Sequence, residues 1–226
     1  MNILAMDTAA AVLSVGLAAN KNTWYFEADA GNRHSEILLP TVDMLLKNAG
    51  ISLKNVDLVA CMKGPGSFTG LRIAFAAAKG ISLSSGCKIA AVPTFDCMAY
   101  PYTDRRGIII PVLDAKKRAF FCALFKNGKR VSEDMDAEPR RIEEGIREAD
   151  ADSLSDVLLT GQDAALLLPQ LSALSAVLPN RISLAKDLRR GFARELLVLA
   201  EAYIDDTALF AGPAYIRKSD AELSLT

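Results

Sequence analysis

The chain has 226 residues and a formal net charge of −1, and 51% of its residues are hydrophobic. This length suits one large domain or two small ones, and the composition is that of an ordinary globular protein. A charge so close to zero excludes a global field that would attract the chain to nucleic acid or to a membrane surface. A single histidine excludes every metal site that needs two, such as the zinc motif H-E-x-x-H.

The cysteines indicate a reducing compartment. Cys61, Cys87, Cys97 and Cys122 form no C-x-x-C motif and lie in apolar runs, as reduced core residues do. The first residues lack the basic start and long apolar stretch of a signal peptide, and no run approaches the roughly 18 apolar residues of a membrane span. We therefore expect a cytoplasmic protein with no membrane contact.

The first half of the chain predicts three meandering strands followed by alternating helices and strands. Gly50 ends the first helix, and Leu38, Val42 and Leu45 fall on one face of it. The expected elements are strands over 3–6, 12–18 and 23–28, a helix over 34–49, a strand over 56–62, a helix over 69–83 and a strand over 88–92.

The second half repeats this order. Asp7 and Asp114 each end a first strand, and a turn asparagine, Asn20 or Asn127, follows at the same spacing. The expected elements are strands over 108–114, 119–125 and 129–135, a helix near 143–149, a strand over 157–160, a helix over 163–174, a strand near 182 and a helix over 187–203. Two tandem α/β units are predicted, each a mixed sheet with packed helices, with both aspartates at a cleft between them.

A glycine-rich loop, K-G-P-G-S-F-T-G-L-R at 63–72, joins a buried strand to a helix. Backbone N–H groups and the helix dipole at such a junction favour an anion. The spacing matches neither the Walker A loop nor the dinucleotide fingerprint, because Thr69 takes the place of the required glycine in both. A tight turn capped by Ser67 or Thr69 is the alternative, and the residues alone leave the two open.

The helix after this loop is apolar nearly all round, from Ile73 to Ala78. Such a helix is buried on more than one side. Together with Met44 and the two leucines after it, this helix could present an apolar surface to a partner chain. The alternative is that the two helices only cover each other. If a partner is bound, replacing Phe75 or Ala76 with Glu should abolish the complex and leave the monomer folded.

The stretch G-P-G-S-F-T-G-L-R at 64–72 resembles the signature of the TsaB family, also called YeaZ, of bacterial tRNA threonylcarbamoyladenosine modification. Weaker matches follow the family order: I-L-A-M-D-T-A at 3–9, His34-Ser35-Glu36, Leu38-Leu39-Pro40, Leu113-Asp114-Ala115-Lys116 and Pro213-Ala214-Tyr215-Ile216-Arg217. Lys63 departs from the family, which often has arginine there. TsaD-like relatives carry a metal-binding histidine pair that this chain, with His34 alone, cannot form.

The resemblance implies an actin/sugar-kinase/Hsp70-like fold, with subdomains over 1–103 and 104–226 and the last helix and tail packing back on the first. It implies a non-catalytic scaffold that binds TsaD, and with it TsaE, for modification of adenosine 37 of tRNA. Homodimers are expected without TsaD, and tRNA is expected to be reached only indirectly. The interface it implies comprises His34, Leu38, Val42, Leu45, Phe68, Leu71, Arg72, Phe75, Ala76 and Lys79.

Two other functions stay open. A stand-alone ATPase or kinase would use a nucleotide site of Asp7, Thr8, Gly66, Ser67, Thr69 and Asp114. No cofactor is required by the scaffold function, although ATP or ADP with Mg²⁺ at an assembled interface is compatible with it. Direct tRNA binding would use the cations that crowd residues 105–130, for which a solvated charged surface is the alternative.

Overall fold

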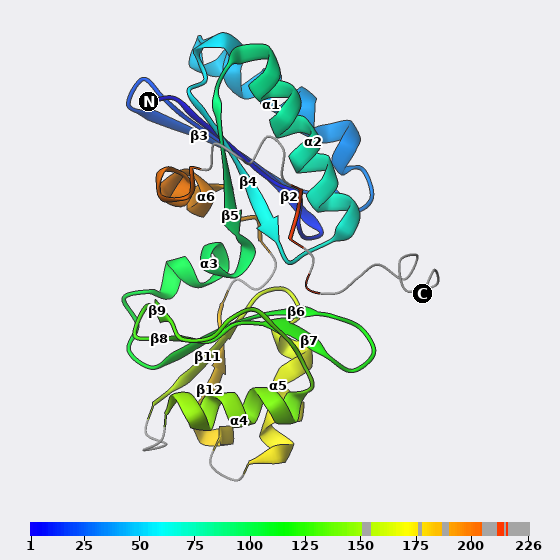
Figure 1. Cartoon of the computed structure of the whole chain (residues 1–226), viewed down its shortest axis with the longest axis vertical. Coiled ribbons are helices and arrows are strands. Elements are labelled where there is room, and N and C mark those ends of the chain that lie inside the picture. The colour runs from blue at the N-terminus through cyan, green and yellow to red at the C-terminus, as the bar shows by residue number, and fades with distance from the viewer. Residues whose placement is uncertain (151–154, 176–177, 187–189, 205–211, 215, 217–226) are drawn as a thin grey trace. The chain divides into compact units, whose positions relative to one another are not determined.

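The computed structural model describes residues 1–150, 155–175, 178–186, 190–204, 212–214 and 216. The chain forms two compact units (Figure 1), and the described residues divide between them. Unit 1 comprises residues 1–97 and 190–214, and unit 2 comprises residues 98–189 and 215–226. Most of the expected C-terminal tail, including Tyr215 and Arg217, lies outside the described residues.

Unit 1 is built on one five-stranded sheet with the order β3-β2-β1-β4-β5. Its strands are β1 (Ile3–Asp7), β2 (Val12–Ala19), β3 (Asn22–Asp29), β4 (Leu58–Gly64) and β5 (Lys88–Pro93). The first three strands pair antiparallel, whereas β1, β4 and β5 run parallel. The central strand β1 is buried along its whole length, as a strand with both faces covered should be.

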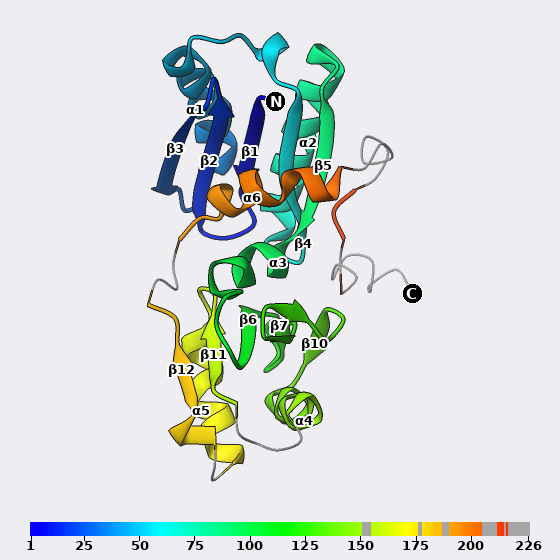
Figure 2. The ribbon, with the colours of Figure 1, turned by 90° about the vertical axis from the view of Figure 1, so that its left-hand side faces the viewer.

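Helices cover both faces of this sheet. Figures 1 and 2 show α1 (His34–Ala49) and α2 (Phe68–Ser85) on one face and the short helix α6 (Ala193–Leu199) across the other. Gly50 and Gly86 end α1 and α2 in left-handed conformation. A 3-10 helix, Ala200–Tyr203, continues α6, and Ile204 then forms an antiparallel bridge with Ala90 of β5. Residues 193–204 thus belong to unit 1.

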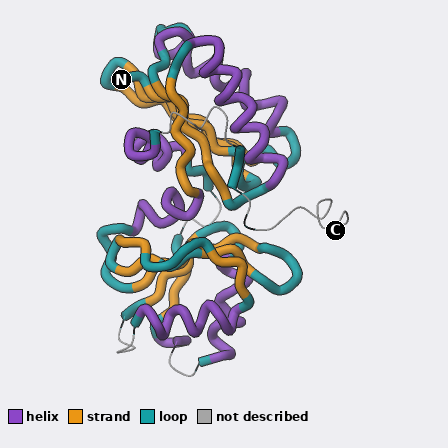
Figure 3. The backbone as a smooth tube through the Cα atoms, in the orientation of Figure 1, coloured by secondary structure: helices purple, strands orange, loops and turns teal. Residues whose placement is uncertain are grey.

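Unit 2 repeats the plan around β6 (Ile108–Asp114), with the strand order β10-β7-β6-β11-β12. The other strands of this path are β7 (Phe120–Cys122), β10 (Met135–Ala137), β11 (Val157–Thr160) and β12 (Ile182–Leu184). A short ribbon of β8 (Phe125–Lys126) and β9 (Lys129–Arg130) pairs with the start of β6. Helices α4 (Pro139–Ala149) and α5 (Ala164–Leu174) pack on this sheet, and α3 (Thr94–Ala99) follows β5 (Figure 3).

The two sheets share one connectivity. In each, the first strand of the unit lies in the centre, its two antiparallel successors lie on one side, and two parallel strands lie on the other. The α/β class and the tandem repeat expected from the sequence are therefore confirmed.

Three predicted elements of the sequence were wrong in extent. The strand expected over 119–125 is broken, because Leu124 donates its N–H to the Ser132 hydroxyl and accepts from Val131 instead of continuing the β7 ladder. The strand expected over 129–135 is likewise divided into β9 and β10. The helix expected from 187 begins only at Ala193 within the described residues, and 187–189 lie outside them.

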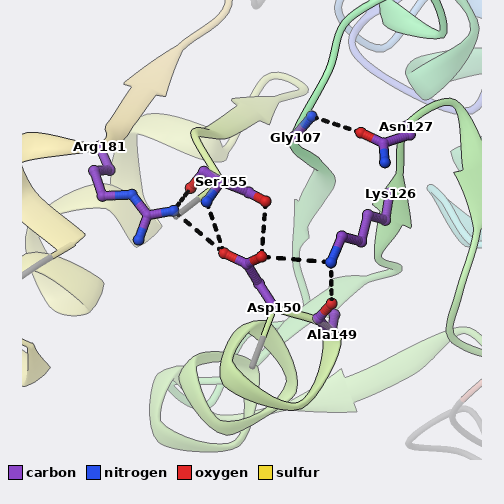
Figure 4. A network of polar contacts seen from close by, with 7 residues as sticks. All are labelled: Gly107, Lys126, Asn127, Ala149, Asp150, Ser155 and Arg181. Carbon is purple, nitrogen blue, oxygen red and sulfur yellow. Dashed lines mark hydrogen bonds and ion pairs between the residues drawn. The ribbon is translucent and has the colours of Figure 1, made fainter. Parts of the chain in front are cut away.

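A buried ion-pair network holds together the chain segments at one end of unit 2 (Figure 4). The Asp150 carboxylate accepts from the Ser155 N–H and hydroxyl, both at 2.8 Å, from Arg181 at 3.2 Å and from Lys126 at 3.4 Å. Burial alone would raise the pKa of Asp150, but these donors together lower it to about 2. Lys126 also donates to the Ala149 carbonyl at 2.7 Å, which ties the end of α4 to β8.

The four cysteines are buried and unpaired. Among the described residues, none of the helices has the length and apolar character to cross a lipid bilayer.

Candidate functional site

The glycine loop closes tightly on the end of β4 and opens α2. Ser67 is the N-cap residue, and its hydroxyl accepts the Gly70 N–H at 3.2 Å. Gly64 has a φ of 118°, a left-handed value that favours glycine, and a side chain there would collide with the Ala214 carbonyl. Ala214 in turn donates its N–H to the Lys63 carbonyl at 2.7 Å, so a short tail segment lies on the loop.

Two further glycines allow this loop to contact the β1–β2 turn. A Cβ atom on Gly66 would lie 2.9 Å from the Ala9 carbonyl oxygen, and one on Gly70 would collide with the Thr8 carbonyl. Two hydrogen bonds stabilise these contacts. The Ser67 N–H donates to the Ala9 carbonyl at 2.8 Å, and the Thr8 hydroxyl donates to the Gly70 carbonyl at 2.6 Å. The glycines are therefore explained by close backbone packing without any ligand.

Asp7 is a buried anchor of unit 1. Its two carboxylate oxygens accept the N–H of Ala9 and the N–H of Phe192, each at 2.9 Å. Phe192 immediately precedes α6, so this side chain fixes the returning segment on the sheet. Burial raises the pKa of Asp7 to about 6, with smaller contributions from Glu195 and Glu27, and outweighs the two backbone hydrogen bonds, which lower it.

The start of α6 has two more contacts with neighbouring strands. The Ser14 hydroxyl accepts the Ala193 N–H at 3.0 Å, and the Tyr25 hydroxyl, which donates to Glu27 at 2.6 Å, lies 3.3 Å from the Gly191 carbonyl. Asp7 and Ser14 face each other across the β1–β2 pair. Polar side chains of three adjacent strands thus hold one helix start, which the sequence alone did not reveal.

Asp114 lies in unit 2 and holds a loop. It accepts the Lys116 N–H and the Lys116 ammonium, both at 2.7 Å, while its own N–H donates to Asp163 at 2.9 Å. The hydrogen bond from the Lys116 side chain is the main reason that the pKa of Asp114 is lowered. Asp114 therefore stabilises its own hairpin.

The unit 1 residues of the expected nucleotide site do not present a phosphate cradle. Both oxygens of Asp7 accept backbone N–H groups, Thr8 donates to Gly70, and the β1–β2 turn occupies the space beside Gly66. Ser67 and Thr69 are exposed on the loop. Because Asp114 belongs to the other unit, the full nucleotide set stays a prediction. No cluster of three or more metal-ligating side chains occurs in the described part of the chain.

The expected interface residues divide into a buried and an exposed group. His34 is buried, and its Nε2 lies 2.9 Å from the Ala10 carbonyl. The apolar members that face the core of unit 1 are Leu38, Val42, Leu45, Leu71 and Phe75. Phe68, Arg72 and Ala76 are exposed and Lys79 is half-buried. The expectation that Phe75→Glu would leave the monomer folded is therefore wrong, because Phe75 is only 3% exposed. The interface itself stays a prediction.

The outer surface of the same two helices forms an apolar groove of about 590 Å³. We call this the α1–α2 groove; it is lined chiefly by Leu39, Leu53, Ile73, Ala76, Gly80 and Ile81. Leu39 is 54% exposed, and the nearby α2 residue Leu83 is 74% exposed. A Cβ atom added to Gly80 would meet nothing within 4 Å, so no internal contact requires glycine there. The described residues leave this apolar surface accessible.

Sequence reasoning missed Leu39, Gly80 and Leu83, although the signal was present. Leu39 follows the predicted core position Leu38 on α1 but is exposed, and a glycine inside a helix, such as Gly80, is unfavourable unless something needs the space. Of the interface residues that the family resemblance implied, Leu38, Val42, Leu45, Leu71 and Phe75 are buried, whereas Ala76 is exposed and lines the groove.

The duplicated connectivity, with helices on both faces of the unit 1 sheet, defines the actin/sugar-kinase/Hsp70-like fold. Two solved structures share it along nearly the whole chain. A Pseudomonas aeruginosa protein described as similar to peptidase YeaZ has a TM-score of 0.78 and 24% identity, covering 96% of this chain and 99% of that one. YeaZ from Pseudomonas aeruginosa has a TM-score of 0.74 and 24% identity, covering 95% and 99%.

The family follows from the sequence comparisons. The family model of TsaD, tRNA N6-adenosine threonylcarbamoyltransferase, matches residues 28–223, and the chain belongs to this family. Proteins named tRNA threonylcarbamoyladenosine biosynthesis protein TsaB are also similar. The one from Escherichia coli is 33% identical over 130 residues, 56% of this chain and 55% of that protein. The one from Bacillus subtilis is 31% identical over 132 residues, 57% of each.

A TsaB protein from Buchnera aphidicola subsp. Baizongia pistaciae is 42% identical over 81 residues, 36% of this chain and 37% of that protein. The chain thus spans about half, or less, of the length of these curated relatives. The resemblance to the TsaB/YeaZ family that the glycine loop indicated is confirmed.

Proposed function

We propose that this chain is a non-catalytic subunit of the machinery that makes threonylcarbamoyladenosine at position 37 of tRNA. Its family membership and the names of its relatives support the pathway. The observation that supports a scaffold role is the α1–α2 groove, an accessible apolar surface on two long helices. Monomeric proteins seldom leave such a surface uncovered unless a partner uses it.

The partner proposed for this groove is TsaD. A helix of the partner would place its apolar stripe against Leu39 and Ile73, and the missing side chain of Gly80 would allow close backbone approach. The exposed Phe68–Arg72 pair, with the guanidinium 3.7 Å from the ring centroid, would lie at the start of α2 beside this contact. TsaE joins through TsaD, and a second copy of the chain occupies the groove when TsaD is absent.

The chemistry near Asp7 supports the non-catalytic assignment. An acid that binds Mg²⁺ or positions water must be reachable from solvent, whereas Asp7 is buried and each of its oxygens accepts a backbone N–H group. Nucleotide, where it acts, is proposed to bind at the assembled interface. Magnesium-dependent ATP hydrolysis by the purified chain that disappears in Asp7→Asn would overturn this part of the proposal.

The direct test is co-expression of the chain with TsaD from the same organism, followed by size-exclusion chromatography with light scattering. We expect a stable complex in wild type. Ala76→Glu should weaken it at least tenfold, because a carboxylate enters an apolar contact at a cost of several kcal/mol. Ala165→Glu is the matched control, since Ala165 is an exposed helical alanine on α5 of unit 2.

Retention of the complex by Ala76→Glu would place the interface elsewhere. A wild-type chain that ignores TsaD, with and without TsaE and ATP, would refute the scaffold role. Measurement of threonylcarbamoyladenosine in tRNA from cells depleted of their own TsaB protein and supplied with this chain would test the pathway separately.

A further inference from the structure

The unit 1 sheet ends in an open edge at β3. Figure 2 shows β3 as the outermost strand of this sheet, and it pairs only with β2. Its eight residues, Asn22–Asp29, pair with β2 in one unbroken register. The outer side of such a strand displays N–H and C=O groups that can pair with another strand.

Among the described residues, the other sheet edges are shorter or covered. On the opposite edge of unit 1, Ala90 of β5 forms a bridge with Ile204. The edge strands β10 and β12 of unit 2 have three residues each, and β9 has two. Natural proteins also protect edges with proline, lysine or a bulge, and β3 contains none of these. It instead carries three half-buried aromatic residues in succession, Trp24, Tyr25 and Phe26.

The turn before β3 determines which backbone groups point outward. The two turn residues, 20–21, have φ values of 50° and 63°, as a type I′ hairpin requires. In such a hairpin the flanking residues, Ala19 and Asn22, hydrogen bond to each other, and the bonded pairs then alternate along the strands. The residues that direct their backbone groups away from β2 are therefore Thr23, Tyr25 and Glu27. Within the described part of the chain, no backbone hydrogen bond reaches them from a segment outside the sheet.

We propose that β3 pairs antiparallel with β3 of a second copy of this chain, so that two unit 1 sheets join into one. A two-fold axis makes each strand the partner of its own copy, which is the commonest symmetry of protein dimers. Of the registers that use the outward backbone groups, the one with the longest overlap places Tyr25 opposite Tyr25 of the second copy. Thr23 then lies opposite Glu27 of the second copy.

The side chains are self-complementary in this register. Trp24 lies opposite Phe26 of the second copy, in a pair without hydrogen bonds, where facing side chains are closest. Lys21, which is exposed, lies opposite Asp29 of the second copy, so opposite charges meet at both ends of the ribbon. Asp29 also interacts within its own chain, and the attraction to Lys21 adds to that contact. A shift of the register by two residues in either direction would lose both matches.

This contact uses neither the α1–α2 groove nor TsaD, so it does not depend on the proposed function. The experiment measures self-association of the full chain by sedimentation velocity across a concentration series. Every variant carries Ala76→Glu, which removes association through the groove. In this background we expect a reversible dimer. A chain that stays monomeric at all concentrations would overturn the inference.

Thr23→Pro is the test of the backbone pairing. It removes an N–H that faces outward and leaves the ladder to β2 intact, which is the position where an edge strand accepts proline. The dimer should be about 30-fold weaker, because the two copies together lose two hydrogen bonds worth roughly fivefold each. Thr23→Ala is the matched control, since it keeps the N–H. Equal dimer dissociation constants for the two variants would refute the pairing.

Two further readouts do not depend on the proline. Lys21→Glu brings like charges together at both ends and should weaken the dimer about fivefold, whereas Lys129→Glu on β9 of unit 2 should leave it unchanged. The emission of Trp24 should shift to shorter wavelength on dimerisation, because Phe26 of the second copy covers its ring. A dimer with unchanged emission, or one that is equally stable in both lysine variants, would place the contact elsewhere and overturn the proposal. Circular dichroism in urea identifies any variant that fails to fold, and Lys21→Glu then decides in place of Thr23→Pro.

Discussion

Asp7→Asn offers a quantitative test of the buried carboxylate on β1. The pKa of Asp7 rises from 3.8 to about 6 in the folded protein, so the folded state binds this proton more tightly than the unfolded state. The difference of about 2.2 pH units corresponds to about 3 kcal/mol. This stabilisation is fully present below pH 3.8 and is lost as the pH rises through 6.

Asparagine cannot ionise, so its contribution is constant across this window. The free energy of unfolding of wild type, minus that of Asp7→Asn, should therefore fall by about 2.4 kcal/mol between pH 4 and pH 7, since part of the total of about 3 kcal/mol is already lost at pH 4. Other titrating groups cancel in the difference. Urea titrations followed by the fluorescence of Trp24, the only tryptophan and a residue of unit 1, report the unit that contains Asp7.

A difference that does not change with pH would show that Asp7 is not buried as described. A difference that grows with pH would show that the hydrogen bonds from Ala9 and Phe192 stabilise the charge more than burial destabilises it. Asp150→Asn serves as the comparison, because the pKa of Asp150 is lowered to about 2 and its contribution should be constant between pH 4 and pH 7.

Three further predictions follow from particular side chains. Asp150→Asn should lower the stability of unit 2 by about 1–3 kcal/mol at pH 7, measured by circular dichroism in urea, and the loss should shrink only as the pH falls toward 2. Gly70→Ala should destabilise unit 1 by more than about 2 kcal/mol in thermal melting, because its Cβ would strike the Thr8 carbonyl. Gly80→Ala should instead raise stability by about 0.5–1 kcal/mol while weakening the TsaD complex, and a complex of unchanged affinity would refute the role given to Gly80.

The sequence predicted a helix or turn correctly where neighbouring residues in the chain determine it. The predicted helix over 34–49 agrees with α1, because Gly50 supplies the left-handed residue that ends it. Asn127 and Gly128 both have positive φ, as their hairpin signature predicts. The spacing of apolar residues was enough to predict the order of helices and strands in each half. That order in turn predicted the α/β fold class.

Prediction failed where distant groups decide the structure. The break between β7 and β8 depends on a hydrogen bond from Leu124 to Ser132, which no propensity of the apolar run reveals. The apolar sequence of α2 could not show which side of the helix faces the sheet, because nearly every side is apolar enough to be buried. Phe75 was therefore assigned to an outer surface although it belongs to the core, whereas Gly80 was overlooked.

The glycine loop shows why motif and role must be argued separately. In the sequence it combined the features of an anion site, namely glycines, a preceding buried strand and a helix start. In the structure its glycines allow the β1–β2 turn to pack closely against it, and its Ser67 N–H donates to the Ala9 carbonyl. Asp7, beside that turn, accepts the Phe192 N–H and so anchors α6. The hydrogen bonds of Ser67 and Thr8 fix where α2 begins, and the outer side of α2 is one wall of the α1–α2 groove. A loop position that could hold a ligand instead fixes the start of a helix, and this agrees with the proposal that a partner binds in the α1–α2 groove.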